Sequence, residues 1–212
     1  MKQTKRVAAL MLICAMVLAV FTGCGNSFDA SKYVQAQLDN SYKNDSSLAL
    51  EQKLCTADEA SALYEDGVDQ QVDGFFYGVT VSDDLRARYR TIFADMLSKA
   101  DYTVGESEKG SDNTHSVSIE YKKMKIFEPA LTATMEKAAD LDATDMDQFQ
   151  EDFFALMADC LEAELSKGLE YGDAQTMTMR VEVQDKTYVL NTDDINSLTQ
   201  GLFDTEAIDA MN

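Results

Sequence analysis

The spacing of apolar residues changes from helical to alternating twice along the chain, and this change constrains the fold more than any other feature. In the first half, apolar residues recur at intervals of three and four from Leu85 to Met96, which predicts a helix with one buried face. After Lys99 the interval becomes two, first at Tyr102 and Val104 and again from Val117 to Tyr121. The polar segment 110–113 separates these two runs, so this half predicts a helix followed by a β-hairpin.

The same order recurs in the second half. A cap at Thr144-Asp145 precedes a long helix whose apolar side carries Met146, Phe149, Phe153, Leu156, Met157, Cys160 and Leu165. Alternating residues then run from Met177 to Val183 and resume at Tyr188 and Leu190, with a turn at 184–186. Two hairpins joined into one antiparallel sheet, with helices packed on a face, predict an α+β fold.

Further helix starts complete this plan. Residues 31–43 have helical spacing, Thr56 and Glu59 fit a capping box, Pro129 suits a helix start and Asn191 caps a final helix. We interpret Gly67 as a bend in the helix that Thr56 begins. Because no Pro/Ser-rich linker divides the chain, we expect a single α+β domain over 31–212, with a pseudo-repeat whose halves lie near 31–127 and 128–212.

The first 23 residues are typical of an export signal. Lys2, Lys5 and Arg6 precede an apolar run over 7–20, which is too short for the roughly 20 residues that span a bilayer. Small residues Thr22 and Gly23 then lead to Cys24. We therefore expect a signal peptide over 1–23 and a short tether over 24–30; an uncleaved helix and an ordinary secretory signal are the alternatives.

The run Val20-Phe21-Thr22-Gly23-Cys24 resembles the lipobox of bacterial lipoproteins, with Phe21 where Leu is usual. The segments FDASKYVQAQLDNSYKND, TADEASALYED and SDDLRARYRTIFADML are similar to a group of lipoproteins of unknown function from Gram-positive, often gut-dwelling bacteria. The resemblance implies a diacylglyceryl group and palmitate-type acylation at Cys24, which would become the N-terminus on the outer face of the cell membrane. Its motifs define no active site.

The charge of the chain limits its partners. Lys and Arg number 18 against 38 Asp and Glu, for a formal charge of −20. Nucleic acid is therefore excluded as an expected partner, because phosphate contacts need cations. The acidity suits a solvated surface, and it also favours cationic peptides. A protein and a small molecule remain as further partner classes besides the membrane.

Three sets of residues allow both a functional and a structural interpretation. His115 is the single histidine, which excludes two-histidine metal sites and favours a structural role. Asp140, Asp142, Thr144 and Glu151 match positions of a calcium loop, although Asp145 stands where that loop requires Gly. Cys55 and Cys160 would be left after processing, either as free thiols, which we favour, or as a disulfide.

No catalytic constellation is recognisable in the sequence, so we expect neither an enzyme nor a cofactor or metal. The leading hypothesis is a membrane-anchored binding or interaction domain. A hydrolase of the cell envelope that uses two carboxylates is the first alternative, and a purely structural envelope protein is the second.

Overall fold

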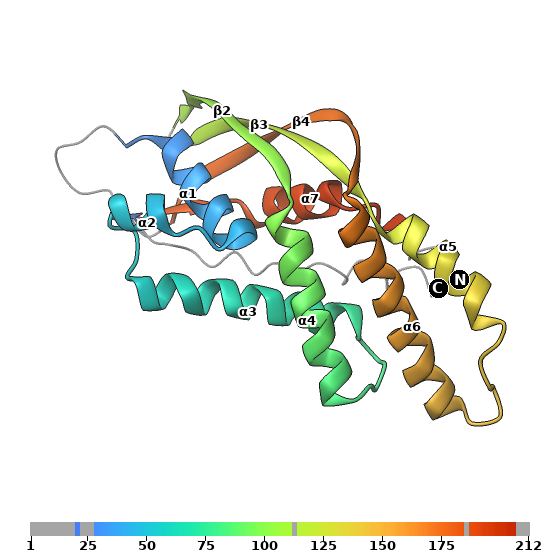
Figure 1. The fold of residues 1–212 in the computed structure, drawn as a ribbon. Helices are drawn as coiled ribbons and strands as arrows, with labels where there is room; N and C mark the ends of the chain where they lie inside the picture. The colour runs from blue at the N-terminus through green and yellow to red at the C-terminus, as the bar shows by residue number, and fades with distance from the viewer. Residues whose placement is uncertain (1–19, 22–27, 112–113, 185–186, 207–212) are drawn as a thin grey trace, which may run out of the picture.

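The computed structural model describes residues 20–21, 28–111, 114–184 and 187–206 (Figure 1). Three of its helices begin at the caps that the sequence predicts at Thr56, Asp145 and Asn191. The capping box is formed: Thr56 Oγ1 accepts from the Glu59 amide at 3.3 Å, and the Glu59 carboxylate accepts from the Thr56 amide at 2.8 Å. Ser82, Asp145 and Asn191 cap the helices that follow them. Each cap supplies an acceptor for amides that lack a partner in the first helical turn.

The elements follow the predicted order of helices, hairpin, helices, hairpin and helix. The helices are α1 (Ala30–Lys43), α2 (Ser47–Glu51), α3 (Ala57–Phe75), α4 (Asp83–Ser98), α5 (Phe127–Ala138), α6 (Met146–Lys167) and α7 (Thr192–Leu202). The strands are β1 (Val20–Phe21), β2 (Asp101–Lys109), β3 (His115–Lys125), β4 (Glu170–Gln184) and β5 (Thr187–Leu190).

The strands form one antiparallel sheet in the order β1-β5-β4-β3-β2. The hairpins β2–β3 and β4–β5 join through the long pairing of β3 with β4, which runs from His115↔Val181 to Lys125↔Glu170. The predicted α+β class, with helices packed on an antiparallel sheet built from two helix–hairpin units, is therefore confirmed. Val20 and Phe21 extend the sheet by a short pairing with Tyr188 and Thr187.

Helices α1 and α7 cover one face of the sheet, and α3 and α4 lie beyond them (Figure 1). Because helices cover only one face, the residues of β3 from His115 to Glu120 alternate between buried and exposed. Helices α5 and α6 form a hairpin that projects from the end of the sheet farther from α1 and α2 (Figure 1). Within the described residues, no helix combines the length and the apolar character needed to cross a membrane.

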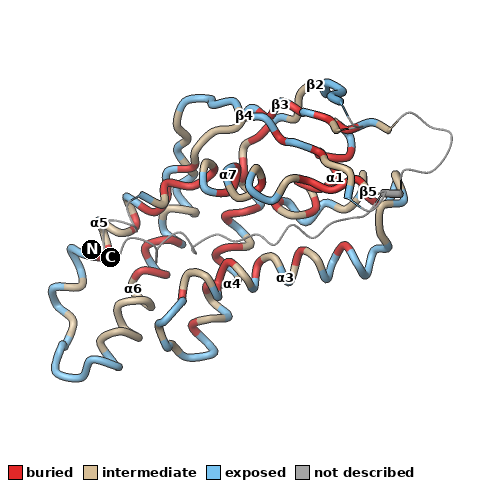
Figure 2. Tube along the Cα trace, turned by 180° about the vertical axis from the view of Figure 1, so that it is seen from behind, coloured by how far each residue is buried: buried red, intermediate tan, exposed pale blue. Residues whose placement is uncertain are grey.

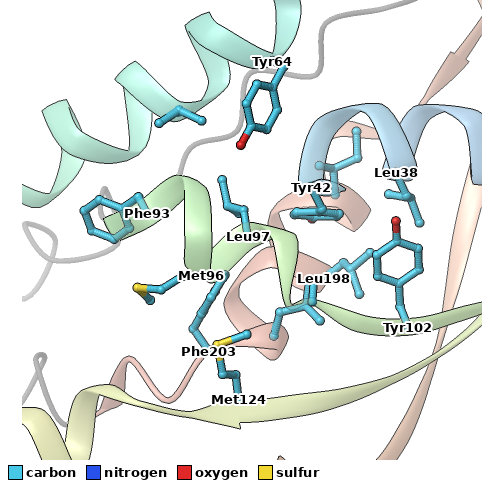
Figure 3. Close-up of a cluster of buried hydrophobic side chains, with 14 of the residues drawn as sticks. Leu38, Tyr42, Tyr64, Phe93, Met96, Leu97, Tyr102, Met124, Leu198 and Phe203 are labelled. Carbon is cyan, nitrogen blue, oxygen red and sulfur yellow. The ribbon is translucent and has the colours of Figure 1, made fainter. Parts of the chain in front are cut away.

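The main core lies between the sheet and the helices and draws on both halves of the chain (Figures 2 and 3). Figure 3 shows Leu38 and Tyr42 of α1 close to Leu198 of α7, with Met124 of β3 beside Phe203. The Tyr42 hydroxyl lies 2.8 Å from the Thr199 hydroxyl, so a buried polar atom of each helix has a partner. This bond fixes α1 against α7 beneath the sheet.

Helix α5 begins with a cap that no local pattern predicts. The carboxylate of Asp204 accepts from the amides of Ile126, Phe127 and Glu128 at 3.1, 2.9 and 3.0 Å. Pro129 lies in the first turn, where its missing amide hydrogen leaves no intrahelical bond unmade. The chain that follows α7 therefore stabilises the start of α5.

Other details differ from the sequence-based expectations. The short α2 was not expected. Helix α3 continues through Gly67 as one helix. The expected apolar side of α6 is buried at Met157 and Cys160, whereas Met146 is 68% exposed. The reason is geometric: the first turns of α6 extend past the core into the projecting hairpin (Figure 2).

Candidate functional site

A groove of about 740 Å³ lies where α5, the last turn of α6 and the ends of β3 and β4 meet. One wall is a single face of α5, formed by Glu128, Thr132 and Glu136 at intervals of four, together with Pro129 and Ala133. The opposite side is lined by Lys125, Glu164, Lys167, Gly168, Leu169 and Glu170. The volume falls in the range of small-molecule sites. We call this feature the α5–α6 groove.

Acidic side chains lie on both walls of the α5–α6 groove. Four glutamates and two lysines give its lining a formal charge of −2. Lys167 Nζ binds the Glu164 carboxylate at 2.8 Å, so one of the cations is paired within the lining itself. The side chain of Glu164 is only 19% exposed, in contrast to Lys167 at 65%. The arrangement suits a ligand that carries positive charge.

Gly168 permits the turn that closes one end of the α5–α6 groove. Its φ is +90°, a backbone conformation that residues with a side chain rarely adopt. Gly168 ends α6 directly before Leu169 and β4. The chain can therefore reverse from the helix into the strand within two residues. This reversal brings Glu164 and Glu170 to the same side of the groove.

A second feature is a cluster of rings at the opposite end of the molecule, formed by Phe28, Tyr33, His115 and Tyr188, which we call the Phe28 cluster. Phe28 stacks on Tyr188, and the centroid of its ring lies 5.2 Å from that of His115. The Tyr33 hydroxyl donates to the carbonyl of Tyr188 at 3.0 Å. The cluster fixes the segment before α1 to strand β5.

His115 lies in this cluster and is 7% exposed. Burial, and then the charge of Lys109, lower the pKa of its imidazole below the ordinary value of 6.5. The ring is therefore mostly neutral at pH 7 and packs as an aromatic group. This environment is that of a structural histidine.

The candidate calcium residues are not brought together. Glu151 lies in α6, and its carboxylate accepts from the Ser82 amide at 3.0 Å at the start of α4. The Asp142 carboxylate accepts from the Thr144 amide within the loop, and Asp145 caps α6. Across the described part of the chain, no group of three or more acidic, histidine or cysteine side chains has a geometry suited to a metal ion.

Cys55 and Cys160 are free thiols. Cys55 follows α2 and packs against the small cluster around Ala36 and Ala49. Cys160 is buried in α6, where the Lys137 ammonium lies 3.8 Å from its sulfur. Cys24, the expected lipid attachment site, lies outside the described residues, as does most of the expected signal peptide.

No protein-family model and no curated protein sequence matches the chain. Among solved structures, its fold resembles that of ycdA from Bacillus subtilis, which is described as a candidate lipoprotein, with a TM-score of 0.56 and 14% sequence identity. The likeness covers 82% of this chain and 56% of the other. The chain thus spans little more than half the length of that protein, and at this identity the likeness concerns the fold alone.

Sequence reasoning did not identify the α5–α6 groove. The one local signal was the recurrence of Glu128, Thr132 and Glu136 on one face of a predicted helix. Apart from Lys125, the opposite wall comes from residues about thirty positions further on, beyond the hairpin loop. A single sequence cannot indicate that these two segments face each other.

Proposed function

We propose that this chain is an extracytoplasmic lipoprotein, anchored through Cys24 on the outer face of the membrane, whose domain binds a ligand in the α5–α6 groove. The observation that carries the anchor is the apolar leader that ends in the lipobox-like run before Cys24. The fold likeness to a candidate lipoprotein gives further support. Two acyl chains on such a cysteine hold a protein stably at a bilayer.

The position of Phe28 supports a domain held close to the lipid. Only residues 25–27 separate Cys24 from the ring that stacks on Tyr188. Four Cα steps at full extension span about 14 Å, so the Phe28 cluster stays within that distance of the acylated cysteine. The α5–α6 groove lies at the other end of the molecule (Figure 1) and is open to the medium.

The lining of the groove supports a ligand with a compact positive group, such as a short basic peptide. Glu128 and Glu136 project from one wall, and Glu164 and Glu170 belong to the other. A cation between them would be within reach of carboxylates from both sides. Charge-assisted hydrogen bonds of this kind are about twice as strong as neutral ones.

The test is binding of a dye-labelled trilysine peptide to the full chain in detergent, measured by fluorescence anisotropy. Replacing Glu128 and Glu136 by Gln should weaken binding roughly tenfold, because two charge-assisted contacts are lost. The matched control replaces Glu51 and Asp58, two exposed acids of the α2–α3 region, by Gln and Asn. Equal losses in both variants would mean attraction to the acidic surface at large and would contradict binding in the groove.

A second candidate function, a hydrolase that uses carboxylates, is favoured by the presence of glutamates on both walls. Such an enzyme needs one acid that donates a proton and a second that acts as nucleophile or base across the substrate. Turnover of cell-envelope glycan by the full chain, lost on Glu164→Gln, would support this function. Peptide binding without turnover would support the binding domain.

A further inference from the structure

The α5–α6 groove already holds one ammonium group, which belongs to its own lining. Lys167 Nζ donates to the Glu164 carboxylate at 2.8 Å, and the two residues lie three positions apart in the last turn of α6. The carboxylate is the less exposed partner, because the Glu164 side chain is 19% exposed and that of Lys167 is 65% exposed. If the lysine turns out into solvent, the half-buried carboxylate is left without its cation and can accept another.

The pair of Lys167 and Glu164 is easily exchanged. An ion pair between neighbouring turns of a helix surface contributes little to stability, because water solvates the lysine nearly as well as the carboxylate does. An ammonium group from outside the molecule can therefore take the place of Lys167 on Glu164 with little loss.

Such a group would also find acceptors on the facing wall. Glu128 and Glu136 line that wall, and neither forms an ion pair with another residue that the structure describes. An ammonium group has three N–H donors, so it can bind Glu164 and a second carboxylate together. The second contact favours the ligand over Lys167.

The α5–α6 groove offers apolar surface beside its carboxylates. Pro129 and Ala133, four positions apart on α5, and Leu169, directly before β4, are half-buried and line the groove. Their uncovered parts suit an aliphatic chain, because apolar surface gains free energy on leaving water. Long side chains that end in a charge commonly pack their methylene groups in this way.

The lining is unsuited to one class of cation. None of the described residues that line the groove is aromatic. Quaternary ammonium groups have no N–H to donate, and proteins recognise them with the faces of aromatic rings. A primary ammonium instead donates to carboxylates, which this groove has on both walls.

We propose that the α5–α6 groove selects a primary ammonium at the end of an aliphatic chain, as in a lysine side chain, and that this group displaces Lys167 from Glu164. The inference rests on the proposed binding of a cationic ligand in the groove and names the chemical class of that ligand. The aliphatic chain packs on the apolar surface of the groove. Lys167 acts as an internal competitor, which lowers the affinity for the ligand.

The first experiment compares two dye-labelled peptides on the unsubstituted full chain in neutral detergent, by fluorescence anisotropy. One is trilysine, and the other is trilysine in which each side-chain nitrogen carries three methyl groups. Their side chains have the same charge, but the methylated ones cannot donate a hydrogen bond. Trilysine should bind at least about tenfold more tightly. Equal affinities would mean that positive charge alone is recognised and would overturn the inference.

The second experiment tests the displacement of Lys167. Lys167→Met keeps an apolar side chain and removes the competing ammonium, so it should strengthen trilysine binding about threefold. Lys125→Met is the matched control, because Lys125 lines the same groove and forms no ion pair within the described ranges. It should strengthen binding less than about 1.5-fold, since salt screens an exposed charge. Equal gains in the two variants would contradict the displacement.

Glu164→Gln completes the comparison. In this background Lys167→Met should strengthen binding no more than Lys125→Met does, because the contested carboxylate is gone. A threefold gain that persists would contradict the role of Glu164.

The outcomes separate this inference from the proposed function. Trilysine binding that depends on Glu128 and Glu136, but is unaffected by methylation and by Lys167→Met, would overturn the inference and leave binding in the groove standing. The absence of any trilysine binding would overturn both.

Discussion

Phe28 stacks face to face on Tyr188, with ring centroids 3.6 Å apart and ring planes inclined by 6°. The contact joins the segment after the expected anchor to strand β5, which lies near the other end of the sequence. Tyr188 is 9% exposed, so Phe28 covers a ring that would otherwise face solvent. The start of the domain is thereby held to the sheet before α1 begins.

Replacing Phe28 by Ala should lower the free energy of unfolding by about 2 kcal/mol, since a half-buried ring and an aromatic pair are lost. Urea denaturation measures this change. Phe28→Leu, which keeps apolar bulk without the stacking, should cost about half as much. No change in either variant would mean that the ring does not stabilise the domain.

Replacing Asp204 by Ala should cost about 2 kcal/mol, because three amides at the start of α5 lose their acceptor. Thermal unfolding followed by circular dichroism measures the loss. The control is Asp193→Ala in the exposed first turn of α7, which should cost less than about 0.5 kcal/mol. Equal effects would contradict a special role for Asp204.

Arg88 connects α4 to α6 through both carboxylate oxygens of Glu162, at 2.9 and 2.7 Å, and through Asp159. These acids hold the pKa of the guanidinium above its usual value. A double-mutant cycle with Arg88→Ala and Glu162→Ala should give a coupling energy of about 1 kcal/mol that falls with added salt, as expected for a partly exposed pair. A coupling of zero at low salt would contradict this link.

The stability of the fold should fall in alkali because buried tyrosines resist ionisation. Burial raises the pKa of Tyr33 from 10.0 to about 12, so the unfolded chain loses this proton first. The stabilisation is complete below pH 10 and is lost between pH 10 and 12, by up to about 1.4 kcal/mol per pH unit.

Urea unfolding between pH 9 and 12 measures this dependence. Tyr33→Phe should reduce the fall in the free energy of unfolding with pH by the contribution of one tyrosine. Tyr77→Phe should not, because Tyr77 is 76% exposed. The buried Tyr42, Tyr89 and Tyr102 also have raised pKa values, so some slope should remain in Tyr33→Phe. An unchanged slope in Tyr33→Phe would contradict the burial of its hydroxyl.

Most of the helices and strands, although not the short α2, were predictable because their signals are local. Thr56 and Glu59 are three residues apart and satisfy each other's amides, and Ser82, Asp145 and Asn191 each cap the turn that follows. The alternation in β3 marks one face for the core. These patterns fixed the α+β class without any knowledge of the tertiary contacts.

The features that required the structure depend on contacts between distant segments. Asp204 caps an amide 78 positions before it, and Glu151 caps the start of α4 from 69 positions away. The calcium hypothesis for Asp140, Asp142, Thr144 and Glu151 was not supported for this reason: a continuous helix carries Glu151 to α4, away from the loop. Physical proximity of this kind leaves no periodic signal in one sequence.

The most direct test of the account is mass spectrometry of the N-terminus of the membrane-bound chain, expressed in a bacterium that processes lipoproteins, with Cys24→Ala as the control. We predict an N-terminal peptide that begins at Cys24 and carries a diacylglyceryl group, and a Cys24→Ala chain that keeps its leader and lacks the lipid. A chain that begins at any other residue, or a Cys24 that carries no lipid, would contradict the account.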